Sequence, residues 1–172
     1  MPEFRIVRLT PENFTSRSLD GFVRTQPVTE VWRKAPDGYR LVRQSFVDDW
    51  SPEHRREKAR ELLSPGHTAY GAFIDGRVAG FVQLGDALDD GRMVVESLHV
   101  SREFRRRGLG RALFAQAVSV GRARGAQSLY ISACSSKETI AFYRTMGCVY
   151  AENVIRRLAE EEPFDLQLIR PL

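Results

Sequence analysis

The segment over residues 93–111 constrains the fold of this chain more than any other, because a strand, an arginine cluster and a glycine turn follow one another in it. Residues 93–100 are mostly apolar and rich in β-branched side chains, a pattern typical of a buried strand. After Gly110 the apolar residues recur at the spacing of one helical face. A buried strand is therefore expected to pass into a helix through the turn Arg105-Arg106-Arg107-Gly108-Leu109-Gly110.

The chemistry of such a turn favours the binding of an anion. Glycine lets the backbone approach a ligand closely, and the first N–H groups of a helix have no partner inside it and lie at the positive end of the helix dipole. The adjacent arginines 105–107, together with Arg111, add full positive charges that can pair with phosphate oxygens. The segment therefore predicts a phosphate or pyrophosphate site.

The spacing of the glycines separates the familiar kinds of phosphate loop. No glycine precedes a Lys-Ser or Lys-Thr pair, so a P-loop is excluded. A dinucleotide fingerprint needs a third glycine at the position of Leu113, which argues against that motif. The pattern Arg-x-x-Gly-x-Gly, filled by Arg105, Gly108 and Gly110, resembles the acyl-CoA signature of the GNAT superfamily of N-acetyltransferases, in which the loop amides hold the CoA pyrophosphate.

A second motif extends the resemblance. The family's pattern Asn-x-x-Ala-x-x-Phe-Tyr-x-x-x-Gly-Phe is similar to a segment of this chain that reads Ser136-x-x-Thr139-x-x-Phe142-Tyr143-x-x-x-Gly147-Cys148. The chain departs from the pattern at Ser136, Thr139 and Cys148. Ser136 keeps a polar group that can contact the pantetheine arm of CoA, with less reach than asparagine. The resemblance covers about residues 68–172 well and the residues before them loosely.

The resemblance implies a mixed α/β fold. We expect a single GNAT domain over residues 1–172, with a central twisted mixed β-sheet, splayed parallel strands and flanking helices. An acyl-CoA-binding core is expected in about residues 68–172, and about residues 1–67 should shape the acceptor pocket. Because a helix separates the strands that end near Val100 and Ala133, these strands should be parallel neighbours.

Local patterns predict the remaining elements. A hairpin between residues 28 and 46 would depart from the GNAT plan, which usually has helices there. Asp48-Asp49-Trp50 is expected to cap the next helix or face solvent, with attraction of a cationic acceptor as the alternative. The expected elements are a strand over 4–9, a helix start at Thr10-Pro11-Glu12, a hairpin turning at Ala35-Pro36-Asp37-Gly38, a helix over 51–63, strands over 68–74 and 78–84 joined by Asp75-Gly76, a strand over 128–133, a helix over 136–146 opened by the capping box Ser135-x-x-Glu138 and closed by Gly147, and strands over 149–153 and 164–169.

The composition argues against several kinds of binding partner. The chain has a net charge of +4 and 26 basic residues, but apart from residues 105–107 the arginines are dispersed and no nucleic-acid motif accompanies them, so no nucleic-acid partner is expected. No apolar run approaches a membrane span and no leader is recognisable, so a cytoplasmic protein without membrane contact is expected. Cys134 and Cys148 lack metal-site spacing, which predicts reduced thiols and no metal.

The activity that the resemblance implies is N-acetyl transfer. Acetyl-CoA would be the cosubstrate, and a primary amine would attack it directly in a ternary complex. The acceptor is expected to be a small-molecule or peptide amine, whose identity stays open, as do a homodimer and a longer acyl donor. The alternatives from other classes are a catalytically silent acyl-CoA-binding module and a basic nucleic-acid-binding protein.

Two residues are expected to handle protons. Glu96 is the candidate general base, because a carboxylate inside an otherwise apolar strand must face a cavity or a partner, and a structural ion pair is the alternative. His99 is the second candidate, but simple alternation turns its side chain away from the face that carries Glu96 and Leu98, which favours a packed or exposed histidine. By resemblance Tyr143 is the general acid, with plain core packing as the alternative. A covalent route through Cys134 is not expected, since no base flanks it.

The cofactor contacts also follow from the resemblance. In the family the central strand separates from its parallel neighbour near its end, and the freed backbone contacts the acetyl carbonyl and the pantetheine. The expected contacts are Leu98, His99, Val100, Arg105, Arg106, Arg107, Gly108, Leu109, Gly110, Arg111, Ser136 and Tyr143.

Overall fold

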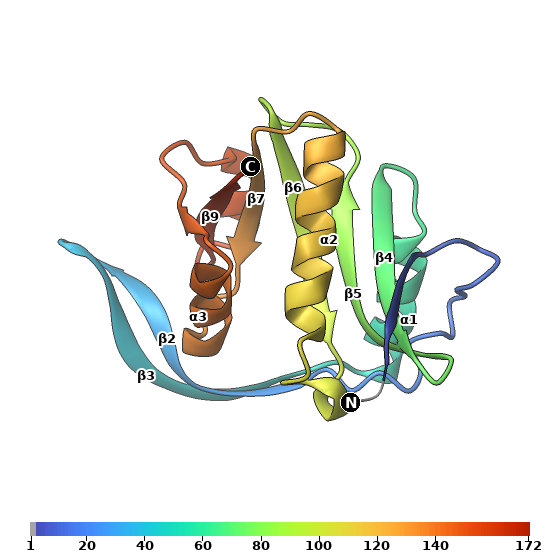
Figure 1. Ribbon diagram of the computed structural model, residues 1–172. Coiled ribbons are helices and arrows are strands. Elements are labelled where there is room, and N and C mark those ends of the chain that lie inside the picture. The colour runs from blue at the N-terminus through green and yellow to red at the C-terminus, as the bar shows by residue number, and fades with distance from the viewer. Residues whose placement is uncertain (1–2) are drawn as a thin grey trace.

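The computed structural model describes residues 3–172, which form a seven-stranded mixed sheet with helices on both faces and a separate two-stranded hairpin (Figure 1). In order across the sheet the strands are β1 (Arg5–Arg8), β4 (His67–Ile74), β5 (Arg77–Gly85), β6 (Arg92–Val100), β7 (Ser128–Ala133), β9 (Leu166–Pro171) and β8 (Val149–Tyr150). Neighbouring strands are antiparallel except β6 and β7. The expected mixed α/β fold and the expected parallel pair are confirmed.

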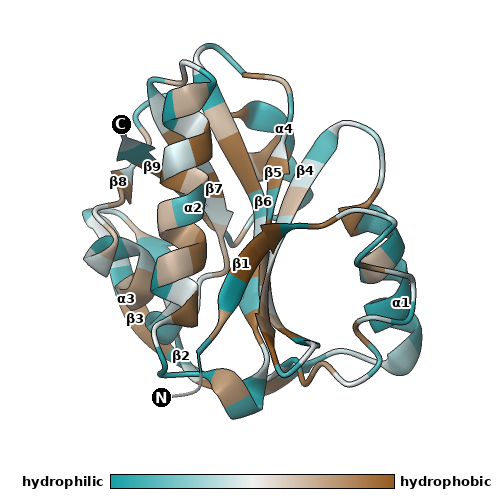
Figure 2. Cartoon of the chain, turned by 45° about the vertical axis from the view of Figure 1, so that its right-hand side comes forward, coloured by the Kyte–Doolittle hydropathy of each residue, from teal (hydrophilic) through white to brown (hydrophobic). Residues whose placement is uncertain are grey.

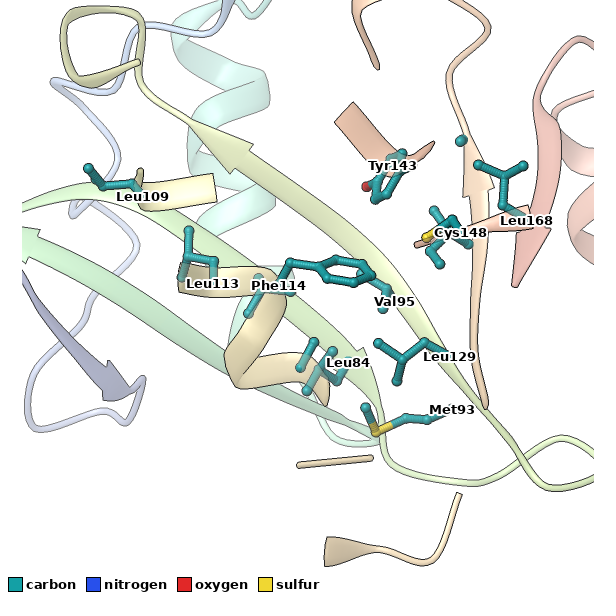
Figure 3. Packing of buried hydrophobic residues seen from close by; sticks show 14 of the residues in the cluster. Leu84, Met93, Val95, Leu109, Leu113, Phe114, Leu129, Tyr143, Cys148 and Leu168 are labelled. Carbon is teal, nitrogen blue, oxygen red and sulfur yellow. The ribbon is translucent and has the colours of Figure 1, made fainter. Parts of the chain in front are cut away.

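Helices cover both faces of the sheet. On one face α2 (Leu109–Ala123) and α3 (Lys137–Thr145) pack on the strands, and Figure 3 shows Phe114, Tyr143 and Val95 in this core. On the other face, α1 (Pro52–Leu62) buries Leu62, and the short helix α4 (Arg156–Glu161) buries Leu158. Hydrophobic residues gather along the strands and the inner sides of the helices in Figure 2, while α1 is largely hydrophilic. Each fully buried leucine stabilises such a core by about 2 kcal/mol.

The parallel pair comes apart partway along its length. β6 pairs with β7 at Arg92, Met93 and Val94 only, although β6 continues to Val100 and β7 to Ala133. β7 pairs with β9 along its whole length, so the separation leaves the second half of β6 without a neighbour on that side. The expected splay of the parallel strands is thereby confirmed.

A long hairpin crosses the end of the sheet where the strands separate. It consists of β2 (Thr25–Ala35) and β3 (Gly38–Asp49), joined by the two-residue turn Pro36-Asp37. Figure 1 shows it passing below α2 and curving up beside α3. The N–H of Trp32 donates to the carbonyl oxygen of Ser135 at 2.8 Å, which fixes β2 to the start of α3. The hairpin expected from the sequence is present.

Several local predictions hold because their cause is local. Ser51 caps α1 by accepting from the N–H of His54 at 3.1 Å, and Asp75 and Gly76 both have a positive φ in the turn between β4 and β5. Gly147 takes the left-handed conformation (φ 85°) after α3. β1 fills the strand expected over residues 4–9 and lies at an edge of the sheet.

Other local predictions are wrong. The segment after Thr10 forms turns rather than a helix. Ser136, not Ser135, caps α3, since its Oγ accepts from the N–H of Thr139, while the Oγ of Ser135 accepts from Arg33 Nη1 at 2.7 Å. β8 is limited to two residues, β9 starts later than expected, and α4 was not expected. Among residues 3–172, no helix is long and apolar enough to span a membrane.

Candidate active site

The turn between β6 and α2 presents a row of backbone N–H groups. Gly108 precedes α2 in the left-handed conformation (φ 84°), and Arg106 also has a positive φ, of 64°. The first bond of the helix runs from the N–H of Ala112 to the carbonyl of Gly108 at 3.0 Å. The N–H groups of residues 106–111 have no acceptor within the described part of the chain. This row at the positive end of α2 fits a pyrophosphate.

Arg105 stabilises the turn through hydrogen bonds to two backbone carbonyls. Its Nε donates to the carbonyl of Val100 at 3.1 Å, and its Nη1 donates to the carbonyl of Thr25 at 2.8 Å. Partial burial and the nearby charge of Arg24 lower its pKa. These bonds join the end of β6 to the start of β2, so the main contacts of Arg105 are structural. A further contact from Arg105 to CoA stays a prediction.

The other arginines of the turn are closer to solvent. Arg106 and Arg111 are exposed. The Arg107 guanidinium lies over the ring of Phe104, 5.5 Å from its centroid, and its outer side is also exposed. These three side chains are therefore the free positive charges around the N–H row.

Gly108 and Gly110 are required for different structural reasons. A side chain at Gly108 would meet no atom within 4 Å, so the requirement there is the positive φ. A Cβ at Gly110 would lie 3.3 Å from the ring of Phe142, so this glycine lets α2 and α3 approach each other. The expected close approach of the pyrophosphate to the backbone of Gly110 stays a prediction. Leu109 is buried in the core, so only its backbone can face a ligand.

The separated part of β6 offers backbone groups to a ligand. The N–H of Ser101 donates to the carbonyl of Ala79 in β5. The alternation of β6 therefore turns the N–H and C=O groups of Leu98 and Val100 away from β5. They point to the side on which β7 has departed. This geometry suits the contacts expected of Leu98 and Val100, which stay predictions.

Glu96 occupies a β-bulge. Gln83 of β5 pairs with Ser97 and Leu84 pairs with Val95, so Glu96 is the extra residue on β6. Its side chain is exposed. The premise that this carboxylate is enclosed by an apolar strand is wrong, because the bulge turns it outward.

The bulge also changes the face of the sheet on which Glu96 lies. A Cβ on Gly85 would be 3.4 Å from Glu96 Oε1, and Gly85 shares a face of β5 with Phe81. The His99 ring packs edge-on against Phe81, with centroids 5.6 Å apart. Glu96 and His99 therefore lie over the same face, and the expected separation by simple alternation is wrong.

A short polar chain holds His99. Its Nδ1 accepts from Arg24 Nε at 3.0 Å, and Arg24 Nη2 lies 2.9 Å from Asp48 Oδ2. Burial, followed by the charge of Arg24, lowers the pKa of His99 well below its usual value. Because Nδ1 accepts, the neutral ring carries its proton on Nε2. His99 is thus arranged as a hydrogen-bond donor rather than as a base.

Tyr143 lies in the core near the start of the separated region. It is 7% exposed, and Figure 3 shows it in the core with Phe114, whose ring centroid is 6.0 Å from its own. The ring of Phe142 also packs on it, with centroids 5.2 Å apart. Burial raises its pKa, and no described group forms a hydrogen bond with its hydroxyl. Such a phenol stays protonated at neutral pH and keeps its O–H free to donate.

Ser136 has no hydroxyl capacity left for a ligand. Its Oγ donates to Thr139 Oγ1 at 2.8 Å and accepts from the N–H of Thr139 at 3.3 Å and from Gln26 Nε2 at 3.2 Å. The side chain is also fully buried. These bonds give Ser136 a structural role between α3 and Gln26 of β2, and the expected contact with the pantetheine arm stays a prediction.

Both thiols are free and unreactive in character. Burial raises the pKa of Cys134, and it raises the pKa of Cys148 to about 12. A thiol becomes a nucleophile through its thiolate, so these shifts argue against a covalent route.

Comparison with known proteins gives the family. Residues 35–148 match the model of the acetyltransferase (GNAT) family. The chain belongs to the GNAT acetyltransferase family. It is an acetyl-CoA-dependent acetyltransferase. An uncharacterized N-acetyltransferase in the pepI 3′ region of Lactobacillus delbrueckii subsp. lactis is 25% identical over 158 residues, covering 80% of this GNAT chain and 91% of the relative.

Solved structures share the fold of this GNAT protein. Nourseothricin acetyltransferase has a TM-score of 0.74 at 22% identity, with 98% of each chain covered. A Bacillus anthracis str. Ames protein, provisionally named a streptothricin acetyltransferase and solved with acetyl coenzyme A, has a TM-score of 0.73 at 15% identity, with 99% of each chain covered. The ribosomal-protein-S18-alanine N-acetyltransferase of Escherichia coli has a TM-score of 0.62 at 15% identity, over 98% of this chain and 94% of that one.

Some residues of the site were not found from the sequence. No role was predicted for Arg24, and Asp48 was expected to cap a helix or face solvent. In the structure these two residues form the ion pair that supports His99. Asp165 was also missed; it lies just before β9 and accepts from Ser132 Oγ at 3.1 Å. No local pattern marks these residues, because their partners are distant in the chain.

Proposed function

We propose that this GNAT protein moves an acetyl group from acetyl-CoA to a primary amine by direct attack in a ternary complex. The observation that carries the proposal is that two rows of unpaired backbone groups lie at one end of the sheet. They are the N–H groups of residues 106–111 and, on the free edge of β6, the N–H and C=O of Leu98 and the N–H of Val100, since the C=O of Val100 accepts from Arg105 Nε. The first row suits a pyrophosphate, and the second suits an extended pantetheine arm, which would bind like an added strand.

We further propose that two parts of the chain bind the two substrates. About residues 68–172 supply β6, β7, α2 and α3, and hence the groups suited to acetyl-CoA. About residues 1–67 supply the hairpin β2–β3, which crosses the end of the sheet and would shape the acceptor pocket (Figure 1). The hairpin takes the place of the helices that the GNAT plan usually has.

The oxyanion of the tetrahedral intermediate would be stabilised by backbone. A free N–H near Leu98 donates without any change of protonation, and a donor that is already oriented loses little by reorganising. His99, with its proton on Nε2, would add a second donor in this region. This side chain is therefore proposed as a ligand contact rather than as the base.

Glu96 would accept the proton of the acceptor. An ammonium group with a pKa of about 10 must become neutral before it attacks. The bulge leaves the Glu96 side chain exposed to solvent, over the face that also carries His99. An exposed carboxylate can take the proton directly or through one water molecule.

Tyr143 would act on the leaving group. As the thioester breaks, negative charge develops on sulfur, and the phenol can donate a hydrogen bond to it. Because burial raises the pKa of Tyr143, full transfer of its proton to a thiolate, with a pKa of about 8.5, is uphill. The proposed contribution is therefore stabilisation of the developing thiolate.

The names of the relatives suggest kinds of acceptor. Two of them refer to nourseothricin and streptothricin, and a third refers to the alanine of ribosomal protein S18. We therefore propose a small-molecule or peptide amine.

The test is an acceptor screen that reads free CoA thiol, run beside calorimetry with acetyl-CoA. Thiol release that depends on both the enzyme and one of the amines would support the proposal. Tight binding of acetyl-CoA without release for any amine would instead indicate a silent acyl-CoA-binding module.

A further inference from the structure

An open cavity of about 1070 Å³ lies between the hairpin β2–β3 and the segment that runs from β8 to β9. Aromatic side chains from both sides line it. The rings of Tyr39, at the hairpin tip, and Tyr150, in β8, both line it and stack with centroids 5.1 Å apart. Trp32 and Phe164 also line the cavity. A pocket of this size with apolar walls can take a ligand of several tens of heavy atoms.

Arg144 brings an available positive charge into this cavity. Its guanidinium lies 4.8 Å from the centroid of Trp32 and 5.7 Å from that of Tyr150, and Nη2 donates to the Tyr150 hydroxyl at 2.8 Å. The two rings fix the plane of the guanidinium. In the part of the chain that the structure describes, Arg144 forms no ion pair, and its remaining N–H groups suit a carboxylate.

Arg33, by contrast, has few N–H groups left to bind a carboxylate. It lines the same cavity but donates to the carbonyl of Trp32, to Ser135 Oγ and to Gln44 Oε1, and it stacks on Phe164 at 4.4 Å. Its donors are used within the protein. Arg144 is therefore the better candidate for binding an anionic group.

Asp165 brings an available negative charge into the same cavity. It is half-buried, and its Oδ2 accepts from Ser132 Oγ, which in turn accepts from Gln167 Nε2 at 2.9 Å. Burial raises the pKa of Asp165 to about 6, and no cation among residues 3–172 offsets that burial. A half-buried carboxylate without a cation suits an ammonium ligand.

Asp165 also lies on the side of the cavity that is closer to the proposed reaction site. Ser132, its partner, is on the part of β7 that has separated from β6. Burial is the main cause of the raised pKa values of Tyr143 and Cys134, and the nearby charge of Asp165 raises both further. The carboxylate is therefore within electrostatic reach of Tyr143.

We infer that this cavity binds an acceptor that carries both a primary ammonium group and a carboxylate, with the ammonium on Asp165 and the carboxylate on Arg144. Amino acids and short peptides with a free C-terminus have this chemistry. The inference rests on the proposed acetyl transfer to amines and specifies its substrate class. Asp165 would position the amine, while Glu96 remains the proposed base.

The test compares amines in pairs that differ only in the carboxylate. Suitable pairs are phenylalanine with phenethylamine, lysine with cadaverine, and glycyl-phenylalanine with its C-terminal amide. The member with the carboxylate should have a kcat/KM higher by about 10-fold or more, as expected for one charge-assisted bidentate contact. Calorimetry of each amine on protein saturated with CoA gives binding independently of turnover.

Variants assign the preference to named residues. Arg144→Gln should bring the ratio within each pair to about one, and Arg144→Lys should leave an intermediate ratio, because a charge without the planar fork remains. Asp165→Asn should raise KM for both members of a pair and leave their ratio unchanged. Arg156→Gln, on exposed α4, removes the same charge away from the cavity wall and should change neither quantity. Melting curves confirm that each variant is folded.

The outcomes separate this inference from the proposed function. Turnover of amines with no preference for the carboxylate, or a preference that survives Arg144→Gln in folded protein, would overturn the inference and leave N-acetyl transfer intact. Preferential binding of carboxylate-bearing amines without any thiol release would support the cavity and overturn the proposed reaction. Preference for the members without a carboxylate would indicate a cationic acceptor instead.

Discussion

The side of the molecule suited to acetyl-CoA and the side suited to the acceptor are built in different ways. The first comes mainly from one continuous stretch, in which β6, a tight turn and α2 follow one another. The second combines the hairpin β2–β3 with the end of α3 and the segment from β8 to β9, which are about a hundred residues away along the chain. A site made by one stretch is specified by short-range rules, whereas a site made by distant segments depends on how they pack.

The largest expected effect tests the point where the two sides meet. Tyr143→Phe removes one oxygen and keeps the ring, so it should lower kcat by about 100-fold or more and leave acetyl-CoA affinity nearly unchanged, provided that chemistry limits turnover. Steady-state kinetics and calorimetry on one preparation measure both. A rate per folded molecule that survives within a factor of about three, together with a lower melting temperature, would make Tyr143 a packing residue only.

Glu96→Gln tests the proposed general base on β6. The loss of rate should approach 100-fold near pH 7 and shrink near pH 9, because more of the acceptor is already neutral there. Rates over this pH range with one amine give the comparison. Glu160→Gln, on exposed α4, is the matched control and should keep the parent profile. Equal losses at both pH values would indicate that Glu96 is not the base.

Gly108→Ala tests the acetyl-CoA side alone. A side chain at a positive φ costs roughly 1–2 kcal/mol, so the turn should relax and acetyl-CoA affinity should fall by about 10-fold. Gly125→Ala is a close control, since Gly125 also has a positive φ (74°) and open space, but lies at the other end of α2. Both variants should lose similar stability in denaturant titrations. Equal affinity of the two variants for acetyl-CoA would remove the turn from the binding site.

The exposed arginines of the turn should contribute less. Replacing Arg106 and Arg107 by Gln should weaken CoA binding by about 2- to 5-fold per residue at low salt, and the difference should fade as salt is added. Calorimetry with CoA and dephospho-CoA at several salt concentrations shows whether these charges contact the 3′-phosphate. Arg122→Gln, in the last turn of α2, provides the control for net charge. Identical affinities for both ligands at every salt concentration would leave this face solvated.

The smallest expected effect concerns stability on the acceptor side. Burial raises the pKa of Asp165 to about 6, above the value near ~3.9 of an unfolded chain, so the folded state binds this proton more tightly. The contribution is therefore most favourable below about pH 4 and is lost as pH rises through about 6. Asp165→Asn should be more stable than the parent at neutral pH and gain nothing at low pH, as measured by urea unfolding at several pH values. A parent advantage at neutral pH would show that Asp165 has a stabilising partner.

The contrast between the two sides also explains what the sequence could predict. The turn at Gly108, the cap at Ser51 and the hairpin turn at Asp75-Gly76 are correct because each depends on residues within a few positions. Glu96 was placed wrongly because a single inserted residue reverses the alternation that the argument assumed.

Long-range partners account for contacts that the sequence did not reveal. Ser136 looked free in the sequence, but Gln26, 110 residues earlier, donates to it. Arg105 also donates to the carbonyl of Thr25, 80 residues earlier, a structural contact that no local pattern indicates. The stacking that holds Arg144 depends on Trp32 from the hairpin, so no local pattern could reveal it.

Because β6 and β7 separate early, the sheet has an unpaired strand edge in its interior. Strand edges are normally found at the borders of a sheet, where they invite pairing with other chains, and here one lies beside the fourth strand of seven. A pantetheine arm bound along β6 would complete the sheet as a removable strand. By mass action a ligand at 100 times its Kd adds about 2.7 kcal/mol of stability. The supply of acetyl-CoA would then govern the lifetime of the folded protein as well as its rate of turnover.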